Sequence, residues 1–314
     1  MRPTCLIEHA DCLLHDTGLY HPERPDRFKA IRDRVADDPI SQRLEWRRPD
    51  PAPLEWIERV HTRGYMREVE EACLKGASAL DGGDTLACQD SFRAACLAAG
   101  GALEAVDAVL RDGKLSAFSA LRPPGHHARP HTAMGFCIFN NIAIAARYAL
   151  EHHHLQRVAI IDWDVHHGNG TQETFYEDSQ VFFCSAHQYP FYPGTGSRED
   201  TGGGEAEGLT LNIPLARGAC GADMMDAFRE QAEPILKSFR PQLLLLSAGF
   251  DAHYEDPLGE LVLSDDDFAE LTRWAVRRAE DTCAGRIVSI LEGGYNLDAL
   301  ARSVLVHLEA LVGE

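Results

Sequence analysis

The sequence predicts an α/β fold: a single-domain, three-layer sandwich in which a mainly parallel sheet of about eight strands lies between two layers of helices. Two observations predict it. Short apolar runs alternate along the chain with longer segments of helical periodicity, and these runs are apolar throughout, as strands buried on both faces are. No repeat, low-complexity tract or linker interrupts the alternation, so residues 1–314 are expected to form one domain.

The candidate strands are eight apolar runs of four to six residues: Cys5–Glu8, Leu44–Arg47, Ala117–Leu121, Val158–Asp162, Val181–Ser185, Leu209–Ile213, Leu243–Ala248 and Ile287–Leu291. The candidate helices are Pro22–Ala36, Arg63–Cys73, Asp90–Arg111, Phe136–His153, Ala222–Phe239, Asp265–Cys283 and Leu297–Leu311. Ser264, followed by three Asp, and Asn296 are good N-caps for the last two helices. The Gly- and Pro-rich segment Gln188–Gly208 predicts a long functional loop.

Composition excludes several classes of protein. The chain has 314 residues, and 30 Lys and Arg against 49 Asp and Glu give a formal net charge of −19. This charge argues against nucleic acid as a partner, because phosphates need basic side chains. Nine Cys without a CxxC pair are typical of reduced thiols and a cytoplasmic location. No apolar run reaches the roughly 20 residues of a membrane span, and we expect neither a secretory signal nor a membrane partner.

Polar motifs follow four of the predicted strands. They are RPPGHH (122–127), DWDVHHGNG (162–170), GFDAH (249–253) and EGGYN (292–296). Ligands of an open parallel sheet bind beyond the carboxyl ends of its strands, where these motifs would meet. Four such clusters in corresponding places are not expected by chance, although each alone is a weak signal. The sequence therefore predicts a functional site at this edge.

Asp162, Asp164 and His166 alternate in an extended segment, so they share one side of it. A bend would let two of them bind one metal ion, and Asp251 could add a third ligand from another strand. Two carboxylates and an imidazole with an open position suit hydrolytic Zn²⁺ or another borderline ion such as Fe²⁺. Such an ion would polarise a carbonyl and lower the pKa of its water.

The adjacent His126 and His127 are candidate general acid–base residues. Asp162 and Asn169 are available to orient the two rings. An Asp partner favours the charged imidazolium and an Asn partner favours it much less, which could separate the two roles. Tyr295, placed by a Gly-Gly turn, could donate to an oxyanion opposite the metal. By contrast, the run 152–154 (HHH) at the end of a helical pattern is interpreted as a solvated face.

These motifs resemble those of the histone deacetylase family, within the arginase–deacetylase superfamily. The similarity runs from the HPERP segment (21–25) to Tyr295 and includes RPPGHHA, DWDVHHGNG, FYPGTG, SAGFDAH and LEGGYN. Asn169, where class I members carry Asp, makes the chain resemble the class II branch, which has many bacterial members. The resemblance implies the arginase–deacetylase fold and a zinc-dependent amidohydrolase that removes an acetyl or longer acyl group from the ε-amine of lysine.

The resemblance also implies residue roles. Zinc would be bound by Asp164, His166 and Asp251. His127 would act as general base and then acid, oriented by Asn169. His126, paired with Asp162, would supply electrostatic stabilisation, and Tyr295 would hold the carbonyl oxygen. The substrate tunnel would be lined by Gly135, Phe136, Tyr192, Leu258 and Asp84, of which Asp84 would accept peptide N–H groups.

Structural K⁺ is a further implication of the resemblance. An inner site would use Asp162, Asp164, His166, Ser185 and Ala186, and an outer site would lie near Phe175, Asp178 and Val181. Arg27 would line an internal product channel. Leu258 stands where polyamine-selective relatives carry Glu, which favours an acyl-lysine peptide over a small acyl-amine substrate.

Two alternatives remain open at this point. An acetylpolyamine amidohydrolase would use the same site, and a non-catalytic acyl-lysine-binding module would bind without turnover. A ureohydrolase with two manganese ions is discounted, because it would need further carboxylates where His126 and His127 stand. A homo-oligomer is also left open, with the Gln188–Gly208 loop and the 22–60 region as candidate contact surfaces.

Overall fold

The computed structural model describes residues 2–313 of the chain. Across these residues, eight strands form one sheet in the order β2-β1-β3-β8-β7-β4-β5-β6, and every neighbouring pair is parallel. The strands are β1 (Thr4–Ile7), β2 (Leu44–Arg47), β3 (Ser116–Ser119), β4 (Val158–Asp162), β5 (Val181–Gln188), β6 (Thr210–Leu215), β7 (Leu243–Ala248) and β8 (Ile287–Leu291). Each overlaps a predicted strand, so the predicted fold class is confirmed.

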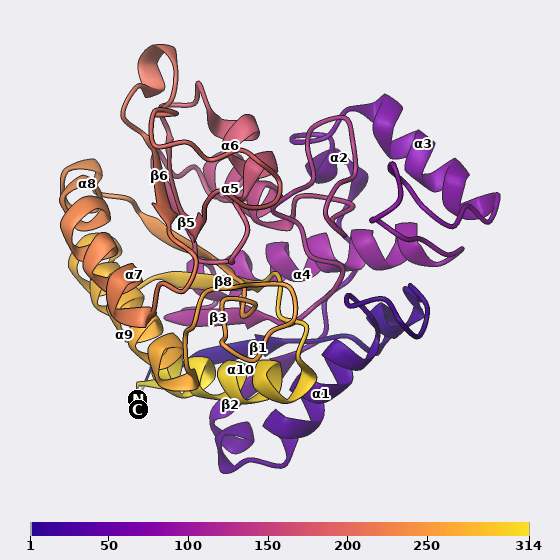
Figure 1. Cartoon of the computed structure of the whole chain (residues 1–314), viewed down its shortest axis with the longest axis horizontal. Coiled ribbons are helices and arrows are strands. Elements are labelled where there is room, and N and C mark those ends of the chain that lie inside the picture. Colours follow the sequence, from indigo (N-terminus) through magenta and orange to yellow (C-terminus); the bar gives the residue numbers. More distant parts are fainter. Residues whose placement is uncertain (1, 314) are drawn as a thin grey trace.

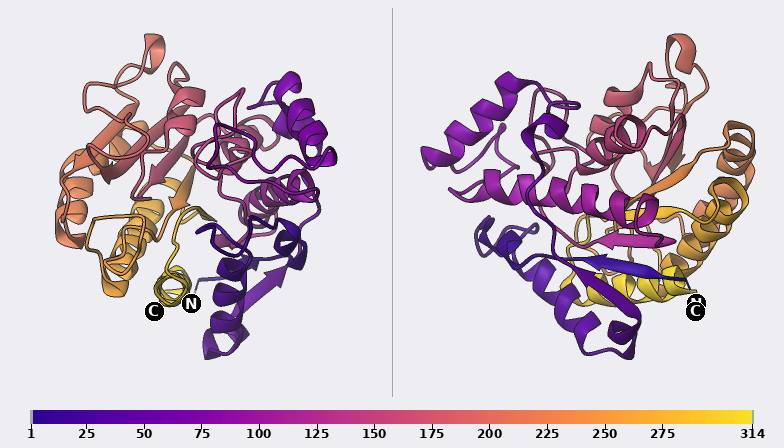
Figure 2. Two further views of the ribbon diagram at one scale, coloured as in Figure 1. Left: turned by 45° about the vertical axis from the view of Figure 1, so that its right-hand side comes forward. Right: turned by 180° about the vertical axis from the view of Figure 1, so that it is seen from behind.

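Helices cover both faces of the sheet (Figures 1 and 2). One face carries α2 (Leu54–Ile57), α3 (Arg63–Leu74), α4 (Ser91–Leu110), α5 (Asn141–Glu151) and α6 (Asn169–Phe175). The other carries α1 (Asp26–Ala36), α7 (Gly221–Ala227), α8 (Glu233–Phe239), α9 (Asp265–Cys283) and α10 (Leu297–Val312). A hydrophobic core fills the space on each side of the sheet, and the strands contribute alternate side chains to the two cores.

The helix predicted over Phe136–His153 is wrong in its first turn. Phe136 has a left-handed backbone with φ of 68°, and α5 begins only at Asn141, after the Asn140 side chain accepts a hydrogen bond from the backbone N–H of Ala143. Residues 136–140 instead lead to a contact with the segment that follows β3, where the Asn140 amide donates to the Ala128 carbonyl at 3.2 Å. Sequence periodicity extended the helix through this segment because its apolar side chains are buried in tertiary contacts.

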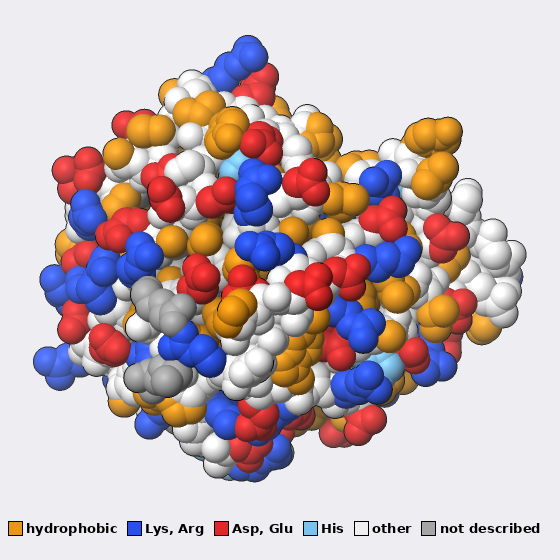
Figure 3. All heavy atoms as spheres, turned by 90° about the horizontal axis from the view of Figure 1, so that it is seen from below, with side chains coloured by type: hydrophobic (Ala, Val, Ile, Leu, Met, Phe, Trp, Pro, Cys, Tyr) orange, Lys and Arg blue, Asp and Glu red, His pale blue; other side chains and the backbone are white. Residues whose placement is uncertain are grey.

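Surface features agree with the composition. No helix within residues 2–313 combines the length and apolarity of a membrane span. All nine cysteines lie in this described part of the chain, and all are free thiols. On the face shown in Figure 3, basic and acidic side chains are intermixed. The first and last of the described residues lie close together at one corner of the molecule, where the N–H of Arg2 donates to the carbonyl of Val312.

A buried ion network lies beneath the edge of the sheet where β3 and β8 end. Glu23 is fully buried, and both its carboxylate oxygens accept hydrogen bonds of 2.6 Å from Arg122. It also lies 3.3 Å from Arg27 Nη1 and 3.4 Å from His15 Nε2. Burial opposes ionisation of Glu23, but the charge of Arg122 and the hydrogen bonds from His15 and Arg122 hold its pKa well below the usual value. This carboxylate therefore stays charged and anchors two buried guanidinium groups.

We expect Glu23→Gln to destabilise the protein by about 3–5 kcal/mol near neutral pH, because it leaves buried arginines without their counter-charge. Since the folded pKa of Glu23 lies below the unfolded value, its stabilisation is present above the unfolded pKa and is lost as pH falls through the folded pKa. The difference in the free energy of unfolding between the wild type and Glu23→Gln should therefore become smaller in acid. Urea unfolding at a series of pH values would measure it. Glu71→Gln, at an exposed pair with Lys75, is the control and should change little.

Candidate active site

The four predicted motifs meet at one edge of the sheet because β3, β8, β7 and β4 are its four adjacent central strands and run parallel. Their carboxyl ends deliver the segments that begin at Ala120, Glu292, Gly249 and Trp163 to the same place. Most of the polar side chains gathered there are almost completely buried. This edge of the sheet therefore carries a compact cluster of ionisable groups, which are held at the ends of rigid strands.

Asp164, His166 and Asp251 form a candidate metal centre. Their ligand atoms lie within 4.8 Å of one another, with His166 Nδ1 3.1 Å from Asp164 Oδ1 and 3.2 Å from Asp251 Oδ2. The backbone fixes the carboxylates: Asp164 accepts hydrogen bonds from Gly293 N at 2.8 Å and His166 N at 2.9 Å, and Asp251 Oδ1 accepts one from Val165 N at 2.9 Å.

The donor set fits a borderline divalent cation. Asp251 Oδ2 is buried and has no hydrogen-bond partner within residues 2–313. Burial and the Asp164 charge raise the pKa of Asp251 to about 7, while the two carboxylates, against burial, raise the pKa of His166 to about 10. Two acids and an imidazole are thus confined together, with a second imidazole nitrogen, His126 Nε2, 3.8 Å from Asp164 Oδ1. A bound cation would give the orphaned Asp251 oxygen a partner and offset the charge of the two carboxylates.

The two adjacent histidines have different partners. His126 Nδ1 lies 2.9 Å from Asp162 Oδ2, and His127 Nδ1 lies 2.7 Å from Asn169 Oδ1. Burial disfavours the charged form of His126, but Asp164 and Asp162 raise its pKa well above the usual value. Burial, together with the neighbouring His126 and His166, lowers the pKa of His127. The pair therefore separates into a charged ring and a neutral ring, whose Nε2 is left for proton transfer.

Glu292, to which the sequence analysis gave no role, holds the histidine loop. It is fully buried, and its Oε2 accepts hydrogen bonds from the backbone N–H groups of Gly125 at 2.6 Å and His126 at 3.1 Å. Its Oε1 accepts one from the Ser247 hydroxyl at 3.1 Å. Burial raises the pKa of Glu292 to about 7. This side chain connects β8 and β7 to the start of the histidine motif.

Tyr295 is positioned by the turn that follows β8. Gly294 has φ of 122°, and a Cβ on Gly293 would stand 2.0 Å from Asp251 Oδ2, so glycine is required at both positions. Arg27 donates to the Gly294 carbonyl at 2.6 Å, and its guanidinium lies 4.9 Å from the centre of the tyrosine ring. Burial raises the pKa of Tyr295 well above its usual value, so the phenol keeps its proton as a donor.

Asp256 is a second residue that sequence reasoning missed. Its Oδ2 accepts hydrogen bonds from the backbone N–H groups of Tyr295 at 2.6 Å and Asn296 at 3.1 Å. Its Oδ1 accepts one from Leu258 N at 3.0 Å. One mostly buried carboxylate thus links the Tyr295 turn to the loop that carries Leu258. Only the adjacency of Asp256 to Leu258 is visible in the sequence, whereas the link to Tyr295 depends on the fold.

A narrow cavity of about 190 Å³ leads to these groups. It is lined by Asp84, His127, Gly135, Phe136, His166, Phe191, Tyr192, Leu258 and Tyr295, which include all five residues expected in a substrate tunnel. The sequence analysis did not name Phe191, whose ring stacks on His166 at 5.4 Å. Gly135 is needed because a Cβ there would meet the His127 ring at 2.4 Å. At the rim, the Tyr192 hydroxyl donates to Asp84 Oδ2 at 3.3 Å.

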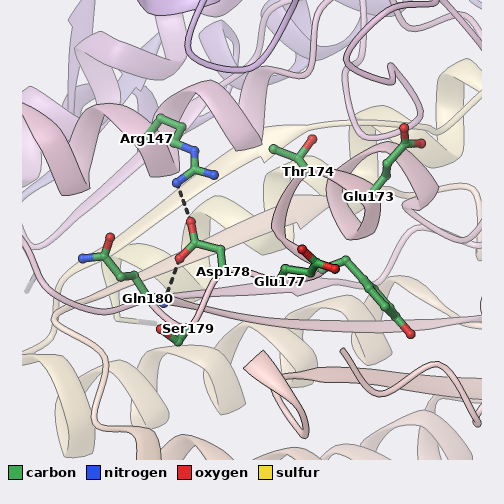
Figure 4. A pocket seen from close by; sticks show the side chains of 8 residues that line it. Arg147, Glu173, Thr174, Glu177, Asp178, Ser179 and Gln180 are labelled. Carbon is green, nitrogen blue, oxygen red and sulfur yellow. Dashed lines mark hydrogen bonds and ion pairs between the residues drawn. The ribbon is translucent and has the colours of Figure 1, made fainter. Parts of the chain in front are cut away.

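The residues expected to hold K⁺ fall in two places. Asp162 and Ser185 pair in register on β4 and β5, and Ala186 follows directly, so the inner set lies beside the candidate metal centre. In the outer region, Asp178 forms an ion pair with Arg147 (Figure 4). The Arg147 guanidinium lies 4.8 Å from the centre of the Phe175 ring. The outer carboxylate thus already has a cationic partner, and backbone carbonyls would have to hold K⁺ there.

Comparison with known proteins agrees with this architecture. A family model described as "Histone deacetylase domain" matches residues 21–311. A "Probable deacetylase" of Archaeoglobus fulgidus is 42% identical over 99% of this chain and 86% of its own length. A "Histone deacetylase-like amidohydrolase" of Pseudomonas aeruginosa is 38% identical over 93% of this chain and 77% of its own. "Histone deacetylase 10, chloroplastic" of Oryza sativa is 44% identical over 94% of this chain and 70% of its own length.

The fold has a counterpart among solved structures. The crystal structure of the HDA15 HD domain superposes with a TM-score of 0.94 and 35% identity, covering 100% of this chain and 89% of that one. Sequence, fold and the strand-end site agree, so the chain belongs to the histone deacetylase family and is a hydrolase that acts on amides.

Proposed function

We propose that this protein is a zinc-dependent amidohydrolase that removes an acetyl or longer acyl group from the ε-amine of lysine in proteins or peptides. One observation carries the proposal. The His127, His166 and Tyr295 side chains line one narrow cavity, and the orphaned carboxylate oxygen of Asp251 lies beside His166. A proton-transfer group, a metal ligand and a phenol donor thus converge where an extended acyl-amine chain would end.

Zinc held by Asp164, His166 and Asp251 would supply Lewis-acid polarisation of the substrate carbonyl and of a water molecule. His127 Nε2 takes a proton from the attacking water and then delivers it to the leaving amine, as a ring that starts neutral can. Tyr295 donates its hydroxyl proton in a hydrogen bond to the developing oxyanion. His126 stays charged beside Asp162 and stabilises the same negative charge.

The walls of the cavity support an acyl-lysine substrate over a polyamine. Phe136, Phe191, Tyr192 and Leu258 are apolar or aromatic, and they suit the methylene chain of lysine. Asp84 at the rim is exposed and is positioned to accept N–H groups of a peptide backbone. We propose Asn169 as the group that orients His127, and the carbonyls and side chains around Asp162 and Ser185 as a site for one structural K⁺.

We also propose a cytoplasmic location and partners other than nucleic acid. The nine free thiols support a reducing compartment. The net charge of −19 and the mixture of acidic and basic side chains in Figure 3 offer no concentrated attraction for phosphates on that face.

The experiment that tests the function is an assay of zinc-loaded protein on a fluorogenic acyl-lysine panel, from acetyl to longer chains, with and without a hydroxamate chelator. We expect hydroxamate-sensitive turnover of at least one acyl-lysine at about one zinc per active site. Turnover of acetylputrescine in preference to every acyl-lysine peptide would assign the protein to polyamines. If the protein binds acyl-lysine but turns over no acyl-amine, it is a binding module and not an enzyme.

Tyr295→Phe should lower kcat by roughly 10²- to 10³-fold, the usual loss when one oxyanion donor is removed. The phenyl ring retains the packing against Phe136, whose ring centre lies 5.6 Å away, so the zinc content and KM should change little. Steady-state kinetics and metal analysis on the same preparation check this. Full activity of the variant would show that the phenol is not the oxyanion donor.

Asp256→Asn should lower kcat roughly 10- to 10²-fold, because an amide cannot accept all three backbone N–H groups and the Tyr295 turn shifts. If Asp256 acts by positioning Tyr295, the same substitution should cost little more in a Tyr295→Phe background. The double-mutant cycle in kcat measures this coupling. Glu255→Gln, at the adjacent exposed carboxylate, is the matched control. Equal losses in both backgrounds would indicate a general structural defect.

A further inference from the structure

Two histidines and a carboxylate meet where the C-terminal ends of α4 and α5 pack together. Asp107 lies in the last turn of α4, and His152 and His153 follow the last residue of α5. One ligand atom from each residue lies within 4.8 Å of the other two. The closest pair is His153 Nε2 and Asp107 Oδ1, at 2.7 Å.

This arrangement differs from the solvated face that the sequence predicts for the histidine run. His153 is only partly exposed and bonds to the nearly buried Asp107. His152 is exposed, but its ring stacks on Tyr148 with centres 4.6 Å apart and planes 8° apart. Both imidazoles are therefore held beside the same carboxylate, and solvent reaches the group from the His152 side.

The surroundings of Asp107 leave one oxygen for a cation. Arg111 Nη1 donates to Oδ2 at 2.7 Å, so that oxygen is already paired. Oδ1 accepts from His153 and, at 3.1 Å, from the Tyr148 hydroxyl. The proton of His153 Nε2 is the group that a metal ion would replace, since a metal-bound imidazole nitrogen is deprotonated. The carbonyl ends of the two helices add a favourable negative potential.

We propose that Asp107, His152 and His153 form a second metal site, which binds a borderline divalent transition-metal ion such as Zn²⁺ and bridges α4 and α5. Two imidazoles and one carboxylate are a donor set that such ions prefer, and the exposed side leaves room for water ligands. None of the three residues lines the catalytic cavity. The site is therefore independent of the proposed deacylase centre, and its ion stabilises the packing of the two helices.

The test is equilibrium dialysis of chelator-stripped protein against excess Zn²⁺, followed by metal analysis. We compare the wild type, the His152→Ala/His153→Ala double variant, the single His152→Ala variant at the exposed ring, and Asp251→Ala at the catalytic centre. His154→Asn is the matched control, because it removes the neighbouring exposed imidazole and asparagine tolerates the left-handed backbone there. The melting temperature is recorded with and without Zn²⁺.

We expect the wild type and His154→Asn to bind one more equivalent of zinc than the double variant, with equal deacylase activity in all three. In Asp251→Ala, zinc should still raise the melting temperature, and adding His152→Ala should reduce that rise. Equal zinc content in the wild type and the double variant would refute the second site, as would loss of the extra equivalent in His154→Asn. Loss of deacylase activity alone would bear on the proposed function and not on this site.

Discussion

Four buried carboxylates at one edge of the sheet are the constraint on which the rest of the site depends. Asp162, Asp164, Asp251 and Glu292 are each within 1% of complete burial, and isolated charges in such a place are strongly disfavoured. Backbone N–H groups and the imidazoles of His126 and His166 stabilise these carboxylates, and the position between Asp164, His166 and Asp251 suits a cation. The glycines at 249 and 293 reflect the same constraint, since they let the chain approach Asp164 and Asp251 closely.

A second layer of charges supports the first. Glu23 forms ion pairs with both Arg122 and Arg27, and Arg27 in turn donates hydrogen bonds to the carbonyls of Glu292 at 2.5 Å and Gly294 at 2.6 Å. Asp256 holds the other side of the same turn. The Arg27 guanidinium and the Asp256 carboxylate thus both hold the turn that carries the Tyr295 phenol. Rigid support of this kind allows a donor to be aimed at a charge that develops only during reaction.

The strands, and the meeting of most candidate-site residues at one edge of the sheet, could be predicted because their signals are local. A continuous apolar run indicates a buried strand, and parallel strands bring the residues after their carboxyl ends to one edge of the sheet. Phe136 was misassigned to a helix because its left-handed backbone depends on tertiary contacts that periodicity does not record. Glu292, Asp256 and Phe191 were given no role for a similar reason. The role of an isolated acidic or aromatic residue depends on contacts with residues that are distant in the sequence.

The position of β8 has a consequence for how the molecule is made. This strand is the last in the sequence, yet it lies between β3 and β7 and joins the half-sheet β2-β1-β3 to the half-sheet β7-β4-β5-β6. During synthesis from the N-terminus, both halves exist before the strand that connects them, and each presents an unpaired apolar edge. The edge that carries the site is therefore completed in one late step. A nascent chain that stops short of residue 287 carries His126 and His127 beyond one half-sheet and Asp164, His166 and Asp251 beyond the other.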